Sequence, residues 1–313
     1  MNDLLISAFV MTAICLAALR SGIWLQQRGS PNRVLFSQLT ILGAMVVYLT
    51  VLWDKPLLTV LIPFPSAIIL GNWLPVLGAF ILGICIATHQ ISIARRIVLA
   101  VSLCVIGGYS LVRPLLGEVP VCAASDPNRL LNFQTTDQTC SAACAAGLLR
   151  LHGIDATEGE MAELCLTRRG THWLGVFRGL KLKTAGTEWD VVVEEVSRED
   201  LLRRTDLEGV LALTFTRESA RYSEESGFGT DVGHTVLSMG TDFRNTLTVF
   251  DPSPDFGFES WNSRILADVR KGILLRLVSR NGTPCPLRTI DRHRPSTWNE
   301  TGLLASLQVR NSR

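Results

Sequence analysis

The sequence predicts an α+β domain that follows a bundle of about four membrane-spanning helices. Four long apolar stretches fill the first 115 residues, and the mean hydropathy of the whole chain is +0.28. After them, segments with helical periodicity come first and strand-like segments follow, the order typical of an α+β domain with an antiparallel sheet. Charge divides in the same way, because the first 120 residues hold only seven of the 30 basic and three of the 28 acidic residues.

The apolar stretches are long enough, with their flanking residues, to cross a lipid bilayer. A hydrocarbon core of about 30 Å takes roughly 20 apolar residues in a helix. The stretches cover residues 4–19, 34–53, 67–88 and 97–112. A cleaved signal peptide fits the first stretch poorly, because Asp3 stands where a basic start is usual and three more apolar segments follow. We therefore expect an integral membrane protein.

Basic residues predict the orientation of these spans, since cytoplasmic loops carry an excess of Lys and Arg. They are Arg20, Arg28 and Arg33 around the first loop, and Arg95 and Arg96 around the third. Four spans then place the N-terminus and everything after residue 112 outside the cytoplasm. Residues 57–70 leave an alternative open, because Pro63 and Pro65 interrupt them. A separate crossing there would make five spans and a cytoplasmic second part.

The remainder of the chain is expected to form one domain behind a linker. Pro120, Asp126 and Pro127 break regular structure between the two parts. The expected divisions are a transmembrane helical region at 1–115, a linker at 116–129, a folded domain at 130–280 and a polar C-terminal tail at 281–313. Beyond residue 120 there are 23 basic and 25 acidic residues. This balance gives no basic field for a nucleic-acid partner.

Within the folded domain, three helical segments precede most of the strands. The first helix runs from Cys140 to Gly153, the second is capped by Thr157 and Glu160, and the third follows a turn at Gly170. Strand patterns and a short helix come next. The expected strands are 189–196, 209–215, 234–240, 246–250 and 271–279, with the short helix at 198–203 and a further ordered stretch at 302–309 in the tail.

Cys140 stands where a polar segment gives way to an apolar, alanine-rich helix, so it lies at the helix N-terminus. The unpaired N–H groups there and the positive end of the helix dipole favour the thiolate over the thiol. A cysteine placed in this way is a candidate nucleophile if a histidine and an orienting acid reach it. His234 and Asp251 are the candidates, because a hairpin between their two strands would bring them to neighbouring strands. His172 is the rival base.

These residues resemble the C39 peptidase family, the bacteriocin-processing, double-glycine-type cysteine peptidases with a papain-like fold. The family pattern is a Gln six residues before the Cys, a small residue after it, Ala at the third position and a Gly thirteen residues on. Further along the chain come a strand His and an Asp-Pro pair. The matching positions are Gln134, Cys140, Ser141, Ala143, Gly153, His234 and Asp251 with Pro252. The resemblance covers residues 130–278, about half of the chain.

Two cysteines fit the first part of the family pattern, because Gln138 and Cys144 are as far apart as Gln134 and Cys140. The distance from each cysteine to Gly153 decides between them. Gly153 follows Cys140 by thirteen residues and Cys144 by only nine, and Cys144 lies one turn inside the helix, where cysteine is usually a small buried hydrophobe. Cys140 is therefore the predicted nucleophile. The sequence departs from the family at Ser141, where many members have Gly, and after His234, where the strand Leu comes one residue early.

The resemblance implies a cysteine peptidase that needs no metal and no cofactor. Cys140 would attack the peptide carbonyl, His234 would act as base and then acid, Asp251 would orient the imidazole, and Gln134 would donate to the oxyanion. It further implies a peptide or protein substrate, a bacterial inner membrane and a possible separate transporter partner. The chain itself holds no G-x-x-x-x-G-K-[ST] phosphate loop, so no ATP is expected to bind.

Two other functions stay open from the sequence. The domain could bind a peptide without cutting it, or the same thiolate could transfer an acyl group to an amine. Disulfide pairing is also open, although Cys122 and Cys285 are one conceivable pair if this part faces an oxidising compartment. Cys144 and Cys165 are the other cysteines beyond the apolar stretches.

Overall fold

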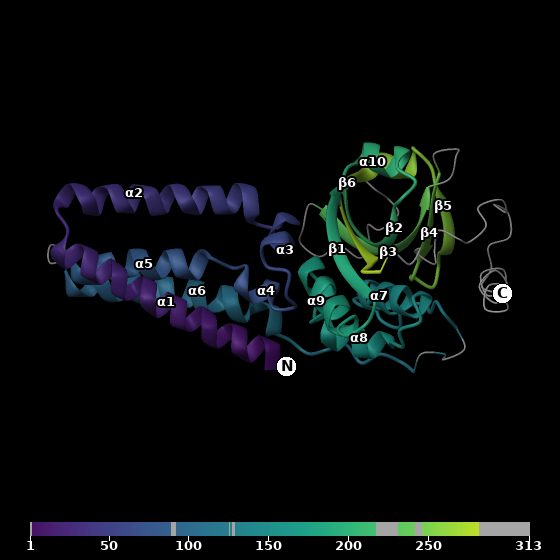
Figure 1. Cartoon of the computed structure of the whole chain (residues 1–313), viewed down its shortest axis with the longest axis horizontal. Helices are drawn as coiled ribbons and strands as arrows, with labels where there is room; N and C mark the ends of the chain where they lie inside the picture. The colour runs from purple at the N-terminus through teal and green to yellow at the C-terminus, as the bar shows by residue number, and fades with distance from the viewer. Residues whose placement is uncertain are drawn as a thin grey trace. The chain divides into compact units, whose positions relative to one another are not determined.

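The computed structural model describes residues 2–88, 92–124, 126, 129–216, 231–241 and 246–281. The chain divides into two compact units, Met1–Leu116 and Gly117–Arg313 (Figure 1). Each unit has its own packing.

The N-terminal unit is helical. Its elements are α1 (Asn2–Arg28), α2 (Pro31–Val47), the π-helical turn η1 (Tyr48–Leu52), α3 (Leu57–Leu61), α4 (Ala67–Leu70), α5 (Leu74–Ala87), α6 (Ile93–Val112) and the 3₁₀ turn η2 (Arg113–Leu115). Among the described residues, four helical segments are long and apolar enough to cross a membrane. They are Asn2–Arg28, Pro31–Leu52, Ala67–Ala87 and Ile93–Leu115. The expected four apolar helices are confirmed.

In this unit α1 is longer than expected, and the segment at 57–70 forms two short helices. The helix α1 continues past the apolar stretch, so Arg20 lies within it and only Arg28 reaches its end. It continues because Ile23 to Gln27 carry no Gly or Pro to stop a helix. The proline-interrupted segment at 57–70 forms α3 and α4, two helices too short to cross a bilayer on their own.

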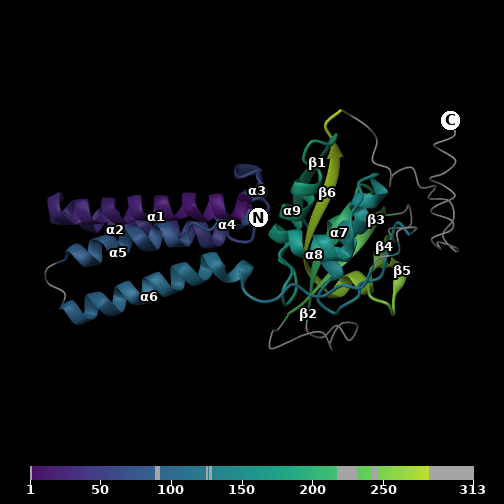
Figure 2. The ribbon, with the colours of Figure 1, turned by 90° about the horizontal axis from the view of Figure 1, so that it is seen from below.

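The helices α1 and α5 lie side by side (Figure 2). They approach each other at Gly22 and Gly83. A Cβ on Gly22 would overlap the carbonyl oxygen of Phe80, and a Cβ on Gly83 would overlap that of Leu19. Small residues allow this close approach between helices in a membrane, where the hydrophobic effect does not drive association. The contact between α1 and α5 therefore depends on the absence of side chains at Gly22 and Gly83.

The C-terminal unit combines helices with a six-stranded sheet. Its helices are α7 (Cys140–Leu151), α8 (Glu158–Leu164), α9 (Trp173–Lys183), α10 (Arg198–Arg203) and the 3₁₀ turn η3 (Ile265–Asp268). Its strands are β1 (Trp189–Val196), β2 (Glu208–Thr216), β3 (Asp231–Thr241), β4 (Leu247–Asp251), β5 (Gly257–Trp261) and β6 (Val269–Ser279). The strand order is β1-β6-β2-β3-β4-β5, with every neighbouring pair antiparallel. The expected mixture of helices and an antiparallel sheet is confirmed.

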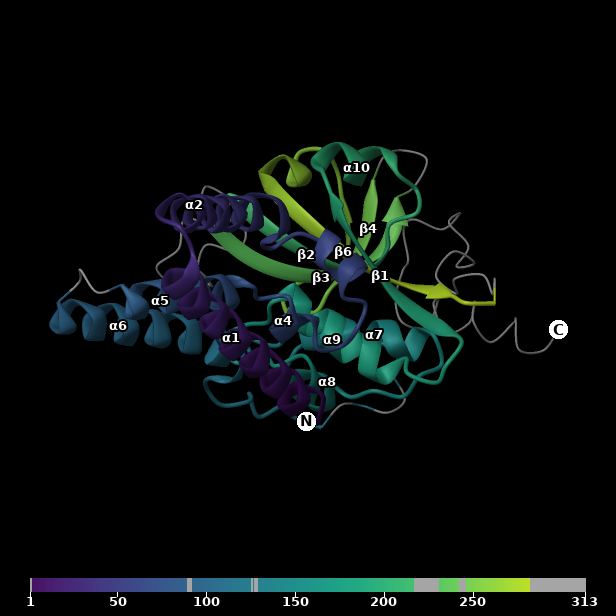
Figure 3. The ribbon, with the colours of Figure 1, turned by 60° about the vertical axis from the view of Figure 1, so that its left-hand side comes forward.

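Helices lie on both sides of this sheet. The helices α7, α8 and α9 pack together on one side, and α10 lies on the other (Figures 1 and 3). Between α10 and the strands is a cluster of fully buried apolar side chains, which includes Leu201, Phe215, Val236 and Trp261. The helix α7 packs on β2 and β3 and buries every residue from Ser141 to Leu149. The sheet therefore holds α7 firmly against β3.

Most predicted elements of this unit form within two residues of their expected ends. The strand at 189–196 and the helix at 198–203 have the predicted bounds. The strand β5 was not predicted, because Gly257 and Glu259 interrupt its short apolar pattern. The stretch expected at 302–309 and Cys285 lie outside the described residues.

Candidate active site

Cys140 is the first residue of α7, and a turn before it fixes the direction of the chain. The Thr139 hydroxyl donates to the Thr136 carbonyl oxygen at 2.9 Å, and Thr139 is completely buried. The helix begins directly after this turn, so the thiol lies beside its unpaired N–H groups. The side chain of Cys140 is partly exposed, which a nucleophile needs.

The opposite end of α7 stops at Gly153, which has a φ of 74°. The N–H of Gly153 bonds the carbonyl of Arg150 at 3.0 Å, and the N–H of Ile154 bonds that of Leu149 at 2.9 Å. Together they form a Schellman motif, in which a glycine takes the left-handed conformation without a Cβ penalty. The predicted helix stop therefore has a local cause.

His234 and Asp251 form a buried pair on the neighbouring strands β3 and β4. The Nε2 atom of His234 lies 3.0 Å from Oδ1 of Asp251, and neither side chain exceeds 1% exposure. The backbone N–H of Ser253 donates to the same Oδ1 at 2.9 Å. This second bond fixes the carboxylate, which in turn fixes the imidazole and leaves Nδ1 for another partner.

The thiol of Cys140 interacts with His234. Burial by itself raises the pKa of Cys140, but a hydrogen bond with His234 and its positive charge outweigh this effect. Hydrogen bonds from the Thr235 backbone and the Ser141 side chain act in the same direction. The net result is a pKa below the ordinary value of a cysteine, so the thiolate is favoured.

The pKa of the His234 imidazole is shifted in the opposite direction, upward. Burial lowers its pKa, whereas its hydrogen bonds with Asp251 and Cys140 and the two negative charges raise it, to about 10 overall. A lowered thiol pKa beside a raised imidazole pKa favours the thiolate–imidazolium ion pair over two neutral groups. Such a pair is the activated form of a cysteine nucleophile.

Gln134 lies against the strand end that carries Asp251. Its backbone N–H donates to the carbonyl oxygen of Pro252 at 2.7 Å, and its side chain is 7% exposed. Its Oε1 atom is buried and meets no hydrogen-bond partner among the described residues. Glu158 holds the next residue, because its Oε1 accepts from Thr135 N at 2.9 Å and from Thr135 Oγ1 at 3.2 Å.

The two rival residues lie in other environments. Cys144 is buried, its Sγ donates to the carbonyl oxygen of Thr235 at 3.5 Å, and burial raises its pKa well above the usual value. His172 caps α9, where its Nδ1 accepts from the N–H of Leu174 at 3.2 Å. The interactions that shift the pKa of Cys140 involve His234 rather than His172. No group of three or more potential metal ligands occurs within the ranges that the structure describes.

Sequence reasoning missed Thr235, which contacts the start of α7 through three groups. Its backbone bonds Cys140, its carbonyl oxygen accepts from Cys144, and its hydroxyl lies 2.8 Å from the Ser141 hydroxyl. No local pattern reveals this role, because the contacts exist only once α7 has packed on β3. The position directly after the predicted base was the one available signal.

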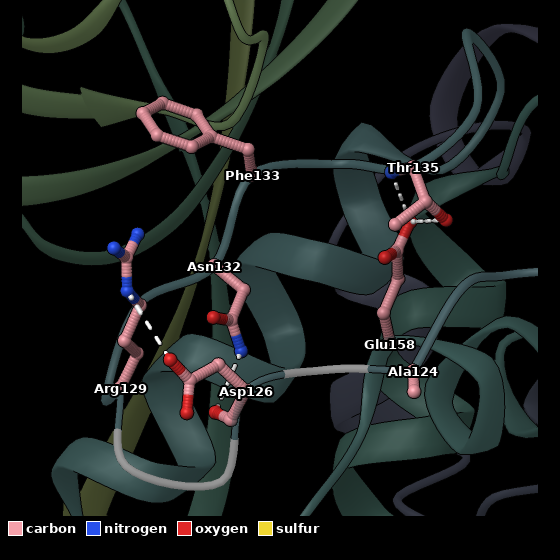
Figure 4. Close-up of a pocket in the computed structure, with 7 residues that line it drawn as sticks. All are labelled: Ala124, Asp126, Arg129, Asn132, Phe133, Thr135 and Glu158. Atoms are coloured by element: carbon pink, nitrogen blue, oxygen red, sulfur yellow. Dashed lines mark hydrogen bonds and ion pairs between the residues drawn. The ribbon is translucent and has the colours of Figure 1, made fainter.

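A pocket of about 220 Å³ lies beside the segment that contains Gln134. Asp126, Arg129, Phe133, Thr135 and Glu158 are among the residues that line it (Figure 4). Arg129 pairs with Asp126 at 3.4 Å, and the Phe133 ring points away from that pair (Figure 4). Cys140, His234 and Asp251 are not part of its lining. The pocket is therefore separate from the Cys–His–Asp arrangement.

No protein-family model and no curated protein sequence matches the chain. Solved structures that are similar to part of it include two peptidase domains. The peptidase domain of Streptococcus ComA, a bi-functional ABC transporter involved in a quorum sensing pathway, is 19% identical over 48% of this chain and 98% of its own, with a TM-score of 0.36. The peptidase domain of Streptococcus mutans ComA is 19% identical over 47% and 98%, with a TM-score of 0.30. Similarity at this level assigns no role to any residue of this chain.

Proposed function

We propose that this protein is a membrane-anchored cysteine peptidase of the C39 type. The observation that carries the proposal is the His234 imidazole held 3.0 Å from the buried Asp251, with Cys140 at the start of α7 and its pKa lowered by His234. Thiolate, imidazolium and orienting carboxylate are the three groups that this chemistry needs. Their order in the chain agrees with the family resemblance described above.

The reaction follows from these positions. The Cys140 sulfur attacks the carbonyl carbon of the peptide bond, and the bond's electron pair moves to oxygen. The backbone N–H of Cys140 and the side-chain amide of Gln134 donate to this oxyanion. The His234 imidazolium then protonates the departing amine, which leaves a thioester on Cys140. His234, now neutral, takes a proton from water, and the resulting hydroxide attacks the thioester carbonyl carbon. The C–S bond breaks, which releases the carboxylic acid and restores the Cys140 thiolate beside the His234 imidazolium.

Labelling separates this function from peptide binding without cleavage. In the full-length protein, iodoacetamide should modify Cys140 at neutral pH, and Cys140→Ala should lose both this label and all hydrolysis of a peptide library. Cys144→Ala is the matched control and should keep both, because Cys144 is a buried neutral thiol. Labelling that follows Cys144 would contradict the assignment. Products joined to an added amine would instead indicate acyl transfer.

We further infer that the C-terminal unit lies outside the cytoplasm. The basic residues near the first and third loops support this orientation, and four candidate spans return the chain to the side of its N-terminus. Protease added to intact spheroplasts should digest residues 130–313. Digestion only after lysis would mean an odd number of spans and a cytoplasmic unit.

A further inference from the structure

The backbone of Gln134 is held on both sides by hydrogen bonds. Its own N–H donates to the carbonyl oxygen of Pro252 at 2.7 Å, directly after the strand that ends at Asp251. The N–H of Thr135, which belongs to the next peptide unit, donates to Oε1 of Glu158 at 2.9 Å (Figure 4). Because each peptide unit is planar, these two bonds restrict both backbone torsions at the Gln134 Cα atom. The direction in which the Gln134 side chain leaves the backbone therefore depends on Pro252 and Glu158.

Glu158 provides the second of these anchors from inside the fold. It is the first residue of α8 and is 1% exposed. Its Oε1 atom also accepts from Thr135 Oγ1 at 3.2 Å, so one oxygen holds the backbone N–H and the hydroxyl of the same residue. The direction of these bonds follows from the groups themselves, since an N–H donates and a carboxylate oxygen accepts. Hydrogen bonds to a carboxylate are stronger than those between neutral groups, which suits an anchor.

This anchoring matters because the proposed role of Gln134 depends on where its amide lies. The side chain is 7% exposed, and its rotatable bonds begin at the Cα atom between the two anchored peptide units. A donor to an oxyanion is effective when it is already in place as the charge develops. A displacement of about 1 Å, caused by a change outside the reacting groups, can lower the rate about 10²-fold.

We propose that Glu158 is a positioning residue for the oxyanion site, acting through the Thr135 backbone on Gln134. The proposal deepens the peptidase function and rests on it, because it requires Gln134 to donate to the oxyanion. It also gives α8 a part in the reaction. This helix places the oxyanion donor, whereas α7 carries the nucleophile and β3 carries the base.

The test compares kcat, KM and the reactivity of Cys140 in the full-length protein in detergent, with a fluorogenic peptide that the wild-type protein cleaves. Glu158→Ala removes the acceptor and should lower kcat about tenfold with little change in KM, because an oxyanion contact is made only in the transition state. Loss of the donor itself typically costs more, about 10²–10³-fold. Iodoacetamide should modify Cys140 at the wild-type rate, because displacement of iodide forms no oxyanion. Glu158→Gln keeps an oxygen acceptor and should lose only about threefold.

Two further variants connect the effect to Gln134. In a Gln134→Ala background, Glu158→Ala should cause no further loss of kcat, because residues that act as a unit are not additive. Glu160→Ala is the matched control in the same helical turn, since both residues are acids in the first turn of α8. The Glu160 carboxylate pairs with Lys183 at 2.9 Å, so this variant should keep kcat. Thermal melting by circular dichroism checks that each variant is folded.

The variants of Glu158 decide the proposal. A folded Glu158→Ala protein with wild-type kcat overturns it. An equal fall in kcat and in the alkylation rate of Cys140 also overturns it, because the change would then act on the nucleophile or on the whole fold. A further loss in the Gln134→Ala background would contradict action through Gln134. If Glu158→Ala does not fold, Glu158→Gln in the two backgrounds decides by the same comparison.

The wild-type protein and Gln134→Ala separate this proposal from the peptidase function. If the wild-type protein cleaves peptides and Gln134→Ala cleaves them equally fast, the oxyanion roles of Gln134 and Glu158 are wrong while the peptidase function stands. A wild-type protein that cleaves no peptide of the library and whose Cys140 reacts like a free thiol overturns the peptidase function and this proposal together.

Discussion

Helices α1 and α7 are both rich in apolar residues, but their side chains meet different surroundings. In α7, every side chain from Ser141 to Leu149 is buried. In α1, large apolar side chains such as Ile6 and Phe9 are exposed, at 64% and 76%. Lipid is a suitable solvent for such exposed groups, whereas water is not. Apolar composition alone therefore does not say which helix belongs to a protein core.

The contacts that hold the two helices differ in the same way. The helix α1 meets α5 through the glycines 22 and 83, where any side chain would prevent the contact. The start of α7 meets β3 through particular side chains, those of Ser141 and Cys144. Adding a side chain should damage the first contact, and removing one should change the chemistry at the second. Four experiments test this difference between the two contacts, ordered from the largest expected effect to the smallest.

Removing the imidazole should have the largest effect. His234→Ala takes away the base and the cation that stabilises the thiolate, so kcat should fall by about 10³-fold or more. Asp251→Asn should lower kcat less, because it changes the tautomer preference and leaves the imidazole in place. The double variant should match His234→Ala, since residues that act as a unit are not additive. Peptide turnover is the measurement, with circular dichroism to confirm folding.

His172→Ala is the control for this series and should retain activity, because His172 caps α9. Loss of turnover in His172→Ala together with full activity in a folded His234→Ala protein would transfer the role of base to His172.

The pH profile should show both members of the ion pair. The pKa of Cys140 is lowered and that of His234 is raised to about 10, so thiolate and imidazolium coexist between these values. The kcat/KM for a peptide should rise as Cys140 ionises, below the ordinary cysteine range, and fall as His234 loses its proton near pH 10. Asp251→Asn should move the alkaline limb to lower pH, because it removes an anion that raises the pKa of His234. An alkaline limb that stays in place would contradict the role of Asp251.

Adding a side chain between α1 and α5 should destabilise the N-terminal unit. Gly22→Leu places a Cβ against the Phe80 carbonyl oxygen, and overpacking of this kind typically costs about 1–3 kcal/mol. Gly43→Leu is the matched control, because nothing lies within 4 Å of a Cβ at that position. The thermal unfolding of the full chain in detergent measures both. Equal melting temperatures would mean that the two helices do not meet at these glycines.

The smallest effect should come from the end of α7. Gly153→Ala puts a Cβ on a residue with a φ of 74°, which costs about 1 kcal/mol. Gly153→Asn should cost less, because asparagine tolerates the left-handed conformation better than alanine. Urea unfolding of the full chain, followed by circular dichroism, gives the free energies. A cost for asparagine equal to that for alanine would argue against a conformational cause.

Much of the fold could be predicted because its signals are local. The helix at 198–203 begins with a capping box between Ser197 and Asp200, and α7 ends at a glycine that its backbone requires. The strand β5 was missed because five residues with Gly257 and Glu259 give no clear alternation. The papain-like architecture and the division at residues 116–129 stay predictions.

The candidate site could be predicted in part. The sequence named Cys140, His234 and Asp251; His234 and Asp251 form a buried pair, His234 lowers the pKa of Cys140, and the catalytic roles stay a prediction. It also places Gln134 against Pro252, although its role in binding the oxyanion stays a prediction. Thr235 and Glu158 could not be predicted, because their partners are distant in the chain and come near only after the helices pack. Local patterns reveal reactive groups more readily than the residues that hold them.

The position of β6 in the sheet has a consequence for synthesis. This last described strand lies between β1 and β2, which precede it by many residues. Until β6 has been synthesised, β1 and β2 therefore lack the strand that pairs with both of them. The strand β2 also pairs with β3, which carries His234. Pairings between distant residues form slowly and late. A nascent chain that has not yet released β6 should accordingly lack the complete sheet that supports the strand carrying His234.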